Sequence, residues 1–276
     1  KCFTYKVYLL QMKILNNIKD LNKAISRIYN LGFVPTMGGL HEGHISLIKN
    51  SKRKCDITLV SIYVNPKQFN SVNDYNNYPR SLSGDIKILK KLNVDYLFIP
   101  KTKDIYKNKN IKITLKNTEK ILCAKFRKGH FEGVLSVMNR LIKIINPKYV
   151  FLGEKDFQQF FLIRRYFKNK YDKCTFFLCK TIRSKKMVAL STRNLLLTKI
   201  QLKKANYIAK FLLKYKTEIK KNKNKIININ KIRKILADKL EVKFDYLEIR
   251  NEKNLSLKIG KNIFKIFIAY YIGNIR

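Results

Sequence analysis

The chain has 276 residues, and 46% of them are hydrophobic, which excludes an intrinsically disordered protein. This length is sufficient for one large α/β domain or two modest ones. No run approaches the roughly 20 apolar residues of a membrane-spanning helix, so we expect no membrane partner.

The formal net charge is +42, from 60 lysines and arginines against 18 acidic residues. Such a charge is typical of nucleic-acid binding proteins. However, lysine, asparagine and isoleucine are abundant throughout the chain, and the lysines occupy nearly every polar face. We therefore favour compositional drift and expect no specific nucleic-acid partner.

The N-terminal residues 1–15 contain lysines and lack a small-residue cleavage site, so we do not expect a signal peptide. The cysteines are scattered and form no C-x-x-C pair, which argues against a disulfide framework and structural zinc. We expect reduced thiols in a cytoplasmic protein. The cysteines are Cys2, Cys55, Cys123, Cys174 and Cys179.

The first two thirds of the chain alternate short apolar segments with amphipathic ones. This alternation predicts right-handed βαβ units and an α/β fold with a Rossmann-like, doubly wound parallel sheet. We predict strands over residues 31–36, 56–64, 94–100, 149–154 and 174–183, helices over 44–54, 83–92, 131–145 and 156–167, and an accessory strand over 112–117.

After about Arg183 the pattern changes to long basic amphipathic segments, which predicts a smaller α+β domain. The low-complexity stretch 221–230 is expected to be a loop or a frayed helix end. We therefore expect two domains, 1–180 and 181–276. The elements predicted in the second domain are helices over 198–221 and 231–243 and strands over 244–251 and 262–273.

The stretch "PTMGGLHEGH" (residues 35–44) holds two of the three histidines of the chain, His41 and His44. It lies between a predicted strand and a predicted helix. Ligands bind beyond the carboxyl ends of parallel strands, and a helix N-terminus offers free N–H groups to phosphate. The stretch therefore predicts an anion site, whereas two surface histidines on a structural turn are the alternative.

This stretch resembles the H-x-G-H nucleotide-binding signature of the cytidylyltransferase-like and class I aminoacyl-tRNA synthetase superfamily. Five further motifs follow it along the chain: "VSIYVNPKQF" from Val60, "YPRSLSGD" from Tyr78, "RKGHFEGVLSV" from Arg127, "FLGEKDFQQFFLIRR" from Phe151 and "ALSTRNLLL" from Ala189. Their order and spacing resemble those of the pantoate–β-alanine ligases (pantothenate synthetases), and the resemblance covers nearly the whole chain.

The resemblance implies an ATP-dependent ligase of pantothenate biosynthesis. Pantoate and ATP would form pantoyl adenylate and pyrophosphate, and β-alanine would then displace AMP. It also implies Mg²⁺, a homodimer, and an ATP site between a Rossmann-like domain and a lid that closes near residues 181–186.

The resemblance also implies roles for individual residues. His44 would be the proton donor, with His41 and Lys155 on the phosphates. Gln68 would contact pantoate and β-alanine, and Gln159 would contact pantoate. The ATP-binding residues would be Met37, Gly38, Gly39, Leu40, His41, Glu42, Gly43, His44, Gly153, Glu154, Lys155, Asp156, Ile182, Leu190, Ser191, Thr192 and Arg193.

These residue types suit the chemistry. Adenylation needs cations and N–H donors near the α-phosphorus, which Lys155, Arg193 and the histidines supply. Mg²⁺ bound to phosphates needs only one or two carboxylates, and Asp85 is a candidate. A glutamine amide both donates and accepts hydrogen bonds, as the hydroxyls and carboxylate of pantoate require.

Taken singly, each motif has a simpler interpretation. Lys155 could belong to an exposed pair at a helix start, and Arg193 could be one more surface cation. His130 could cap a turn, although its "RKGHF" context favours an active-site position. Thr192 stands where the family usually has serine, and Gly84 leaves Asp85 without an acidic neighbour.

The second functional hypothesis is a basic RNA-binding module descended from a synthetase-like domain. It predicts basic residues gathered on one face with interleaved aromatic side chains. The diffuse charge and the retention of Gln68, Gln159 and Lys155 favour the ligase.

Overall fold

The computed structural model describes residues 11–107, 113–221, 228–259 and 263–276. Cys2, most of the N-terminal segment and most of the low-complexity stretch lie outside these residues. The chain divides into two compact units. The first comprises Lys1–Leu115 and Gly129–Thr181, and the second comprises Lys116–Lys128 and Ile182–Arg276.

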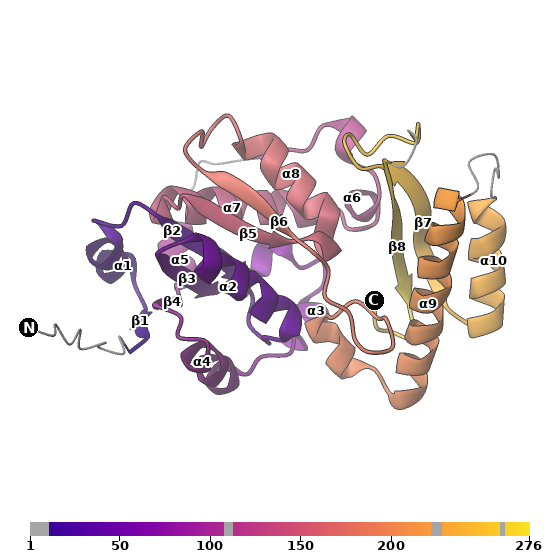
Figure 1. Cartoon of the computed structure of the whole chain (residues 1–276), viewed down its shortest axis with the longest axis horizontal. Helices are drawn as coiled ribbons and strands as arrows, with labels where there is room; N and C mark the ends of the chain where they lie inside the picture. The colour runs from indigo at the N-terminus through magenta and orange to yellow at the C-terminus, as the bar shows by residue number, and fades with distance from the viewer. Residues whose placement is uncertain (1–10, 108–112, 222–227, 260–262) are drawn as a thin grey trace, which may run out of the picture. The chain divides into compact units, whose positions relative to one another are not determined.

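The first unit contains a six-stranded parallel sheet in the order β1-β4-β3-β2-β5-β6 (Figure 1). The order runs outward from β2 in one direction to β3 and in the other to β5. Ligands bind at such a reversal in open α/β sheets. The strands are β1 (Lys13–Leu15), β2 (Leu31–Thr36), β3 (Ile57–Ile62), β4 (Tyr96–Phe98), β5 (Tyr149–Gly153) and β6 (Thr175–Cys179).

Right-handed crossovers fix which face of the sheet each helix covers. The β2–β3 and β3–β4 connections run one way across the sheet and carry α2 (Glu42–Lys54) and α4 (Leu82–Lys91). The β4–β5 and β5–β6 connections run the other way and place α7 (His130–Ile145) and α8 (Phe157–Phe167) on the opposite face, in contact with each other. The shorter helices of this unit are α1 (Ile18–Ile25), η1 (Pro66–Gln68), α3 (Val72–Asn76), α5 (Thr102–Ile105) and η3 (Glu154–Asp156).

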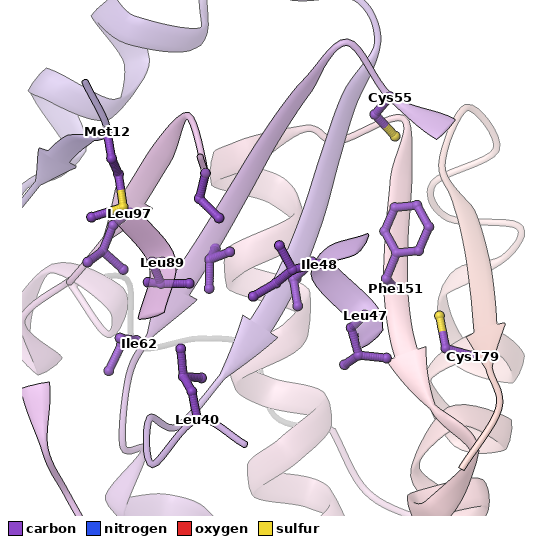
Figure 2. Close-up of a cluster of buried hydrophobic side chains, with 13 residues drawn as sticks. Met12, Leu40, Leu47, Ile48, Cys55, Ile62, Leu89, Leu97, Phe151 and Cys179 are labelled. Carbon is purple, nitrogen blue, oxygen red and sulfur yellow. The ribbon is translucent and has the colours of Figure 1, made fainter. Parts of the chain in front are cut away.

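The α2 face of the sheet is closed by aliphatic side chains (Figure 2). Val34, Val60 and Leu97 lie in register on β2, β3 and β4 and are fully buried. Ile48 of α2 and Leu89 of α4 pack against this row and are also fully buried. Burying such side chains stabilises the fold by about 1.5–3 kcal/mol each. This packing holds β2, β3 and β4 in register, so their carboxyl ends lie at one edge of the sheet.

The second unit contains two antiparallel strands, β7 (Lys243–Asn251) and β8 (Phe264–Tyr271), and the helices α9 (Lys199–Lys221) and α10 (Ile229–Leu240). Ile208, Leu212 and Leu236 of the helices pack with Leu247 of β7. The unit also holds η4 (Thr192–Leu196), η2 (Asn117–Glu119) and α6 (Cys123–Phe126).

Residues 116–128 join the second unit through side-chain contacts with β7. Cys123 Sγ lies 2.9 Å from the Tyr246 hydroxyl and 3.4 Å from Arg276 Nη2. Arg276 Nε in turn donates to Asp245 Oδ2 at 2.7 Å. The sequence pattern did not predict that residues 116–128 belong to the second unit, because these contacts join residues more than a hundred positions apart.

The α/β class with a smaller α+β unit is confirmed, but some elements differ from the prediction. The strand β1 and the helix α1 were not predicted, since β1 has only three residues. The accessory strand over 112–117 is wrong: residues 113–116 form no strand and Asn117 begins η2. None of the described helices is long and apolar enough to cross a membrane.

Candidate active site

The chain makes a tight turn where β2 ends. Gly38 and Gly39 have φ values of 79° and 62°, a left-handed conformation that favours glycine. The buried Asp85 of α4 accepts hydrogen bonds from Gly39 N at 2.9 Å and from Leu40 N at 2.7 Å. A Cβ on Gly38 would lie 2.9 Å from the Asp85 carboxylate. Asp85 therefore holds the turn against α4.

The two histidines cap the N-terminus of α2 reciprocally. His41 Nδ1 accepts a hydrogen bond from Gly43 N at 3.0 Å, and His44 Nδ1 accepts one from His41 N at 3.3 Å. A ring nitrogen that accepts carries no proton, so each neutral ring keeps its proton on Nε2. The ring centroids lie 4.2 Å apart. The pair thus presents two Nε2–H donors at the start of a helix.

Both histidines are neutral at pH 7. Burial lowers the pKa of His44 to about 3, and repulsion from His41 in its protonated form and from Lys155 adds to this effect. Burial and then Lys155 lower the pKa of His41. His44 is therefore a neutral imidazole at pH 7 and not an imidazolium. In the proton-donor role expected of it, it would donate a hydrogen bond through Nε2–H.

The neighbouring strand β5 delivers Lys155 to the same edge of the sheet. β5 ends at Gly153, and η3 follows at once. Lys155 and Asp156 are exposed and lie 3.2 Å apart, and both act electrostatically on His41 and His44. An exposed pair of this kind adds at most about 1 kcal/mol to stability, so Lys155 remains available to an anion.

The segment after β3 carries Gln68 to the glycine turn. Gln68 is the last residue of η1, and its Nε2 lies 2.6 Å from Met37 Sδ. Asn65 caps η1 by accepting from Lys67 N at 3.3 Å, and its own Nδ2 donates to Gln68 Oε1 at 3.3 Å. The Tyr106 hydroxyl donates to Asn65 Oδ1 at 2.9 Å.

Gln159 lies half-buried in the first turn of α8, directly after η3. The end of β5 therefore supplies both Lys155 and Gln159. The fold brings most of the predicted residues of the first unit to one edge of the sheet: Met37–His44 from the β2 end, Gln68 from η1, and Gly153–Asp156 with Gln159 from the β5 end.

The remaining predicted residues form a separate group in the second unit. Leu190 N donates to Ile182 O at 3.0 Å, beside an antiparallel bridge between Arg183 and Ala189. Ser191 Oγ accepts from Arg193 N at 3.4 Å and caps η4. Thr192 is buried. Ile182 and the 190–193 loop are thus neighbours within this unit.

The predicted metal ligand has another task. Each oxygen of Asp85 accepts a backbone N–H group, as described above. Within the described ranges, no group of three or more His, Cys, Asp or Glu side chains could hold a metal ion. These residues fit Mg²⁺ that is held by nucleotide phosphates and do not fit a cage built from protein carboxylates.

Sequence reasoning did not give Asn65 or Tyr106 a role, although both contact the segment that carries Gln68. Asn65 lies within the "NPKQF" motif, which was a usable signal. No motif marked Tyr106, because its contact with Asn65 spans 41 residues.

The comparison with known families decides between the two hypotheses. The family model described as "Pantoate-beta-alanine ligase" matches residues 13–276. The chain belongs to the pantoate–β-alanine ligase family. It is 38% identical to a pantothenate synthetase of Thermosipho africanus, over 96% of this chain and 98% of that one.

Two solved structures extend the comparison to the fold. The chain is similar to the pantoate-beta-alanine ligase from Francisella tularensis, with a TM-score of 0.81 and 38% identity, covering 96% of this chain and 95% of that one. That structure is a complex with Beta-gamma ATP and Beta-alanine. The ligase from Thermus thermophilus gives a TM-score of 0.87 at 29% identity, over 94% and 95% of the two chains.

Proposed function

We propose that this chain is an ATP-dependent ligase that condenses pantoate with β-alanine through a pantoyl-adenylate intermediate. The observation that carries the proposal is the pair of neutral histidines beside Lys155 at the strand-order reversal. Two N–H donors, a helix N-terminus and an exposed cation together suit a nucleotide phosphate. The family to which the chain belongs indicates that the acid is pantoate and the amine is β-alanine.

In the first step, an oxygen of the pantoate carboxylate attacks the α-phosphorus of ATP, and the bond to pyrophosphate breaks. Negative charge gathers on the phosphate oxygens as this occurs. The Nε2–H groups of His41 and His44 donate to these oxygens, and Lys155 adds a positive charge. Because the capping bonds fix the rings, the donors are already oriented when the charge develops.

In the second step, the amine of β-alanine attacks the acyl carbon of the adenylate, and AMP leaves with the electron pair of the broken acyl–oxygen bond. The attacking nitrogen loses one proton, which passes to solvent. We assign Gln68 and Gln159 to pantoate, with Gln68 also contacting β-alanine. Alignment of pantoate with the α-phosphorus supplies much of the rate.

The second unit contributes the residues expected around the nucleotide. We propose that Arg193 contacts the phosphates and that Ile182 contacts adenine, with the 190–193 loop closing the site. Domain 1–180 then binds ATP and pantoate, and domain 181–276 acts as a lid that excludes water from the adenylate.

We propose that Mg²⁺ would be held mainly by the phosphates of ATP and would supply positive charge there. Asp85 contributes by holding the turn that receives them. We further propose a cytoplasmic homodimer, since the reaction consumes ATP and since relatives of this kind are expected to pair. Sedimentation of the purified chain at several concentrations tests the dimer.

The test is AMP release by the purified chain with ATP and Mg²⁺, with pantoate and β-alanine added separately and together. We expect AMP only when pantoate and β-alanine are both present. Pyrophosphate should be released when pantoate is present without β-alanine. Lys155→Ala should lower kcat by about 10²- to 10³-fold. Lys168→Ala removes an exposed lysine beyond the other end of α8 and should leave kcat unchanged.

Release of AMP without pantoate, together with salt-sensitive RNA binding, would contradict the ligase and favour the RNA-binding module. Equal losses of kcat in Lys155→Ala and Lys168→Ala would mean that Lys155 does not act in the active site.

A further inference from the structure

The third histidine, His130, contacts the segment that carries Gln68. His130 is buried and is the first residue of α7, directly after Gly129, whose φ is 78°. Its Nδ1 lies 2.6 Å from the backbone carbonyl oxygen of Gln68. The histidine therefore contacts the backbone of the residue whose side chain we assign to pantoate.

The chemistry of this contact defines the protonation of His130. A carbonyl oxygen only accepts hydrogen bonds, so Nδ1 of His130 carries a proton and donates it. His41 and His44 use the opposite arrangement, since their Nδ1 atoms accept. His130 is therefore configured to hold backbone and not to cap a helix.

The Gln68 carbonyl lies outside the hydrogen bonds of its own helix. A short 3-10 helix does not pair its last carbonyl groups internally. In η1 the backbone bonds run from Gln68 N to Asn65 O and from Phe69 N to Pro66 O, and neither uses the Gln68 carbonyl. His130 supplies this carbonyl with a donor from another element.

The helix α7 also packs directly on the backbone of η1. A Cβ added to Gly133 would lie 2.1 Å from the Lys67 carbonyl oxygen, so the two backbones touch with no side chain between them. Asn65 Nδ2 donates to Gly133 O at 3.3 Å. Gly133 and His130 lie one helical turn apart, and they hold consecutive residues of η1.

We propose that His130 is a positioning residue for Gln68. Its Nδ1–H bond fixes the backbone from which the Gln68 amide reaches pantoate, and its ring does not touch the substrate. This inference rests on the proposed function. Without the bond, η1 keeps its contacts with Asn65 and Gly133 but the Gln68 carbonyl rotates, and the amide loses its direction. The pantoate site is then affected more than the ATP site.

The experiment compares two amide replacements. In His130→Asn, the amide nitrogen takes the place of Nδ1 and the donor remains. In His130→Gln, the amide nitrogen takes the place of Nε2 and the donor is displaced. His130→Leu, which has no donor, gives the same comparison if the glutamine variant does not fold. KM values for pantoate and for ATP are measured from AMP release, together with the melting temperature.

We expect His130→Asn to stay within about threefold of the unmodified chain in pantoate KM. His130→Gln and His130→Leu should raise it at least about tenfold, since small displacements at a reacting centre are costly. The ATP KM should not change in any of them. Phe131→Leu alters the buried ring 4.8 Å from His130 without touching the donor, so it should lower the melting temperature and leave pantoate KM unchanged.

Equal pantoate KM values for His130→Asn and His130→Gln would overturn the inference, as would a parallel rise in both KM values in every variant. If AMP release by the unmodified chain depends on pantoate and β-alanine, and the His130 variants have the same pantoate KM, only the role of His130 is wrong. If the unmodified chain shows no dependence on pantoate, the proposed function fails and this inference fails with it.

Discussion

The glycine turn of the first unit and the 190–193 loop of the second are held in different ways. The turn depends on contacts from distant parts of the chain, since Asp85 lies 46 residues from Gly39. The loop depends on near neighbours: Leu190 N reaches Ile182 O, and Asn194 Nδ2 donates to Ala189 O at 3.1 Å.

This difference predicts different costs of mutation. The residues that hold the turn are either buried and charged, as Asp85 is, or part of the helix cap, as His41 and His44 are. Replacing one of them should therefore affect both stability and catalysis. A residue that fixes the loop is partly exposed, and its loss should change substrate handling with little effect on stability. The first unit is thus expected to be preorganised for catalysis, and the second to adjust during it.

The largest effect is expected from Asp85→Ala. The substitution removes the acceptor of two N–H groups in the turn, and hydrogen bonds to a charged group are each worth about 1.5–3 kcal/mol. We expect the free energy of unfolding in urea to fall by about 3–6 kcal/mol and AMP release to be lost. Asp85→Asn keeps one acceptor oxygen and should lose about half as much stability. If Asp85→Ala abolishes activity at unchanged stability, Asp85 acts on the nucleotide or its metal and not on the turn.

A pH titration of stability gives an intermediate effect. The pKa of His44 is about 3 in the folded chain, below its ordinary value of 6.5, so the unfolded chain binds the proton more readily. Stability from this group is complete above pH 6.5 and falls as the pH is lowered toward 3. At about 1.4 kcal/mol per pH unit, the loss between about pH 6.5 and about pH 5 is about 2 kcal/mol.

His44→Asn is the control for this titration. Its amide oxygen can accept the His41 N–H and keep the cap, but the group does not titrate and has no Nε2–H. Urea unfolding should therefore depend less steeply on pH in this variant, while kcat falls by about 10²-fold at about pH 7.5. An unchanged pH slope would mean that His44 is not buried as a neutral ring.

The smallest effect on stability is expected from Asn194→Ala in the second unit. The substitution removes one partly buried hydrogen bond, worth about 1 kcal/mol. We expect a melting temperature within a few degrees of the original and a several-fold higher KM for ATP, because the loop that carries Arg193 loses a tether. A large drop in melting temperature with normal ATP KM would break the contrast between the two regions.

Local patterns along the chain were enough to predict the alternation of strands and helices, the family, and the residues expected at the site. A buried parallel strand reads as an apolar run, and an H-x-G-H motif is contiguous, so both are visible without a fold. The same patterns placed His41 and His44 at a helix start.

The tasks of several of these residues depend instead on contacts between distant parts of the chain. Asp85 was expected near Mg²⁺, and the sequence did not show that it also holds Gly39 and Leu40, because α4 brings it beneath the turn. The neutral state of His44 depends on burial and on Lys155, which lies in η3 after another strand. His130 contacts Gln68 across 62 residues of sequence. Hydrogen bonds, burial and charge act through space, and spacing along the chain does not record them.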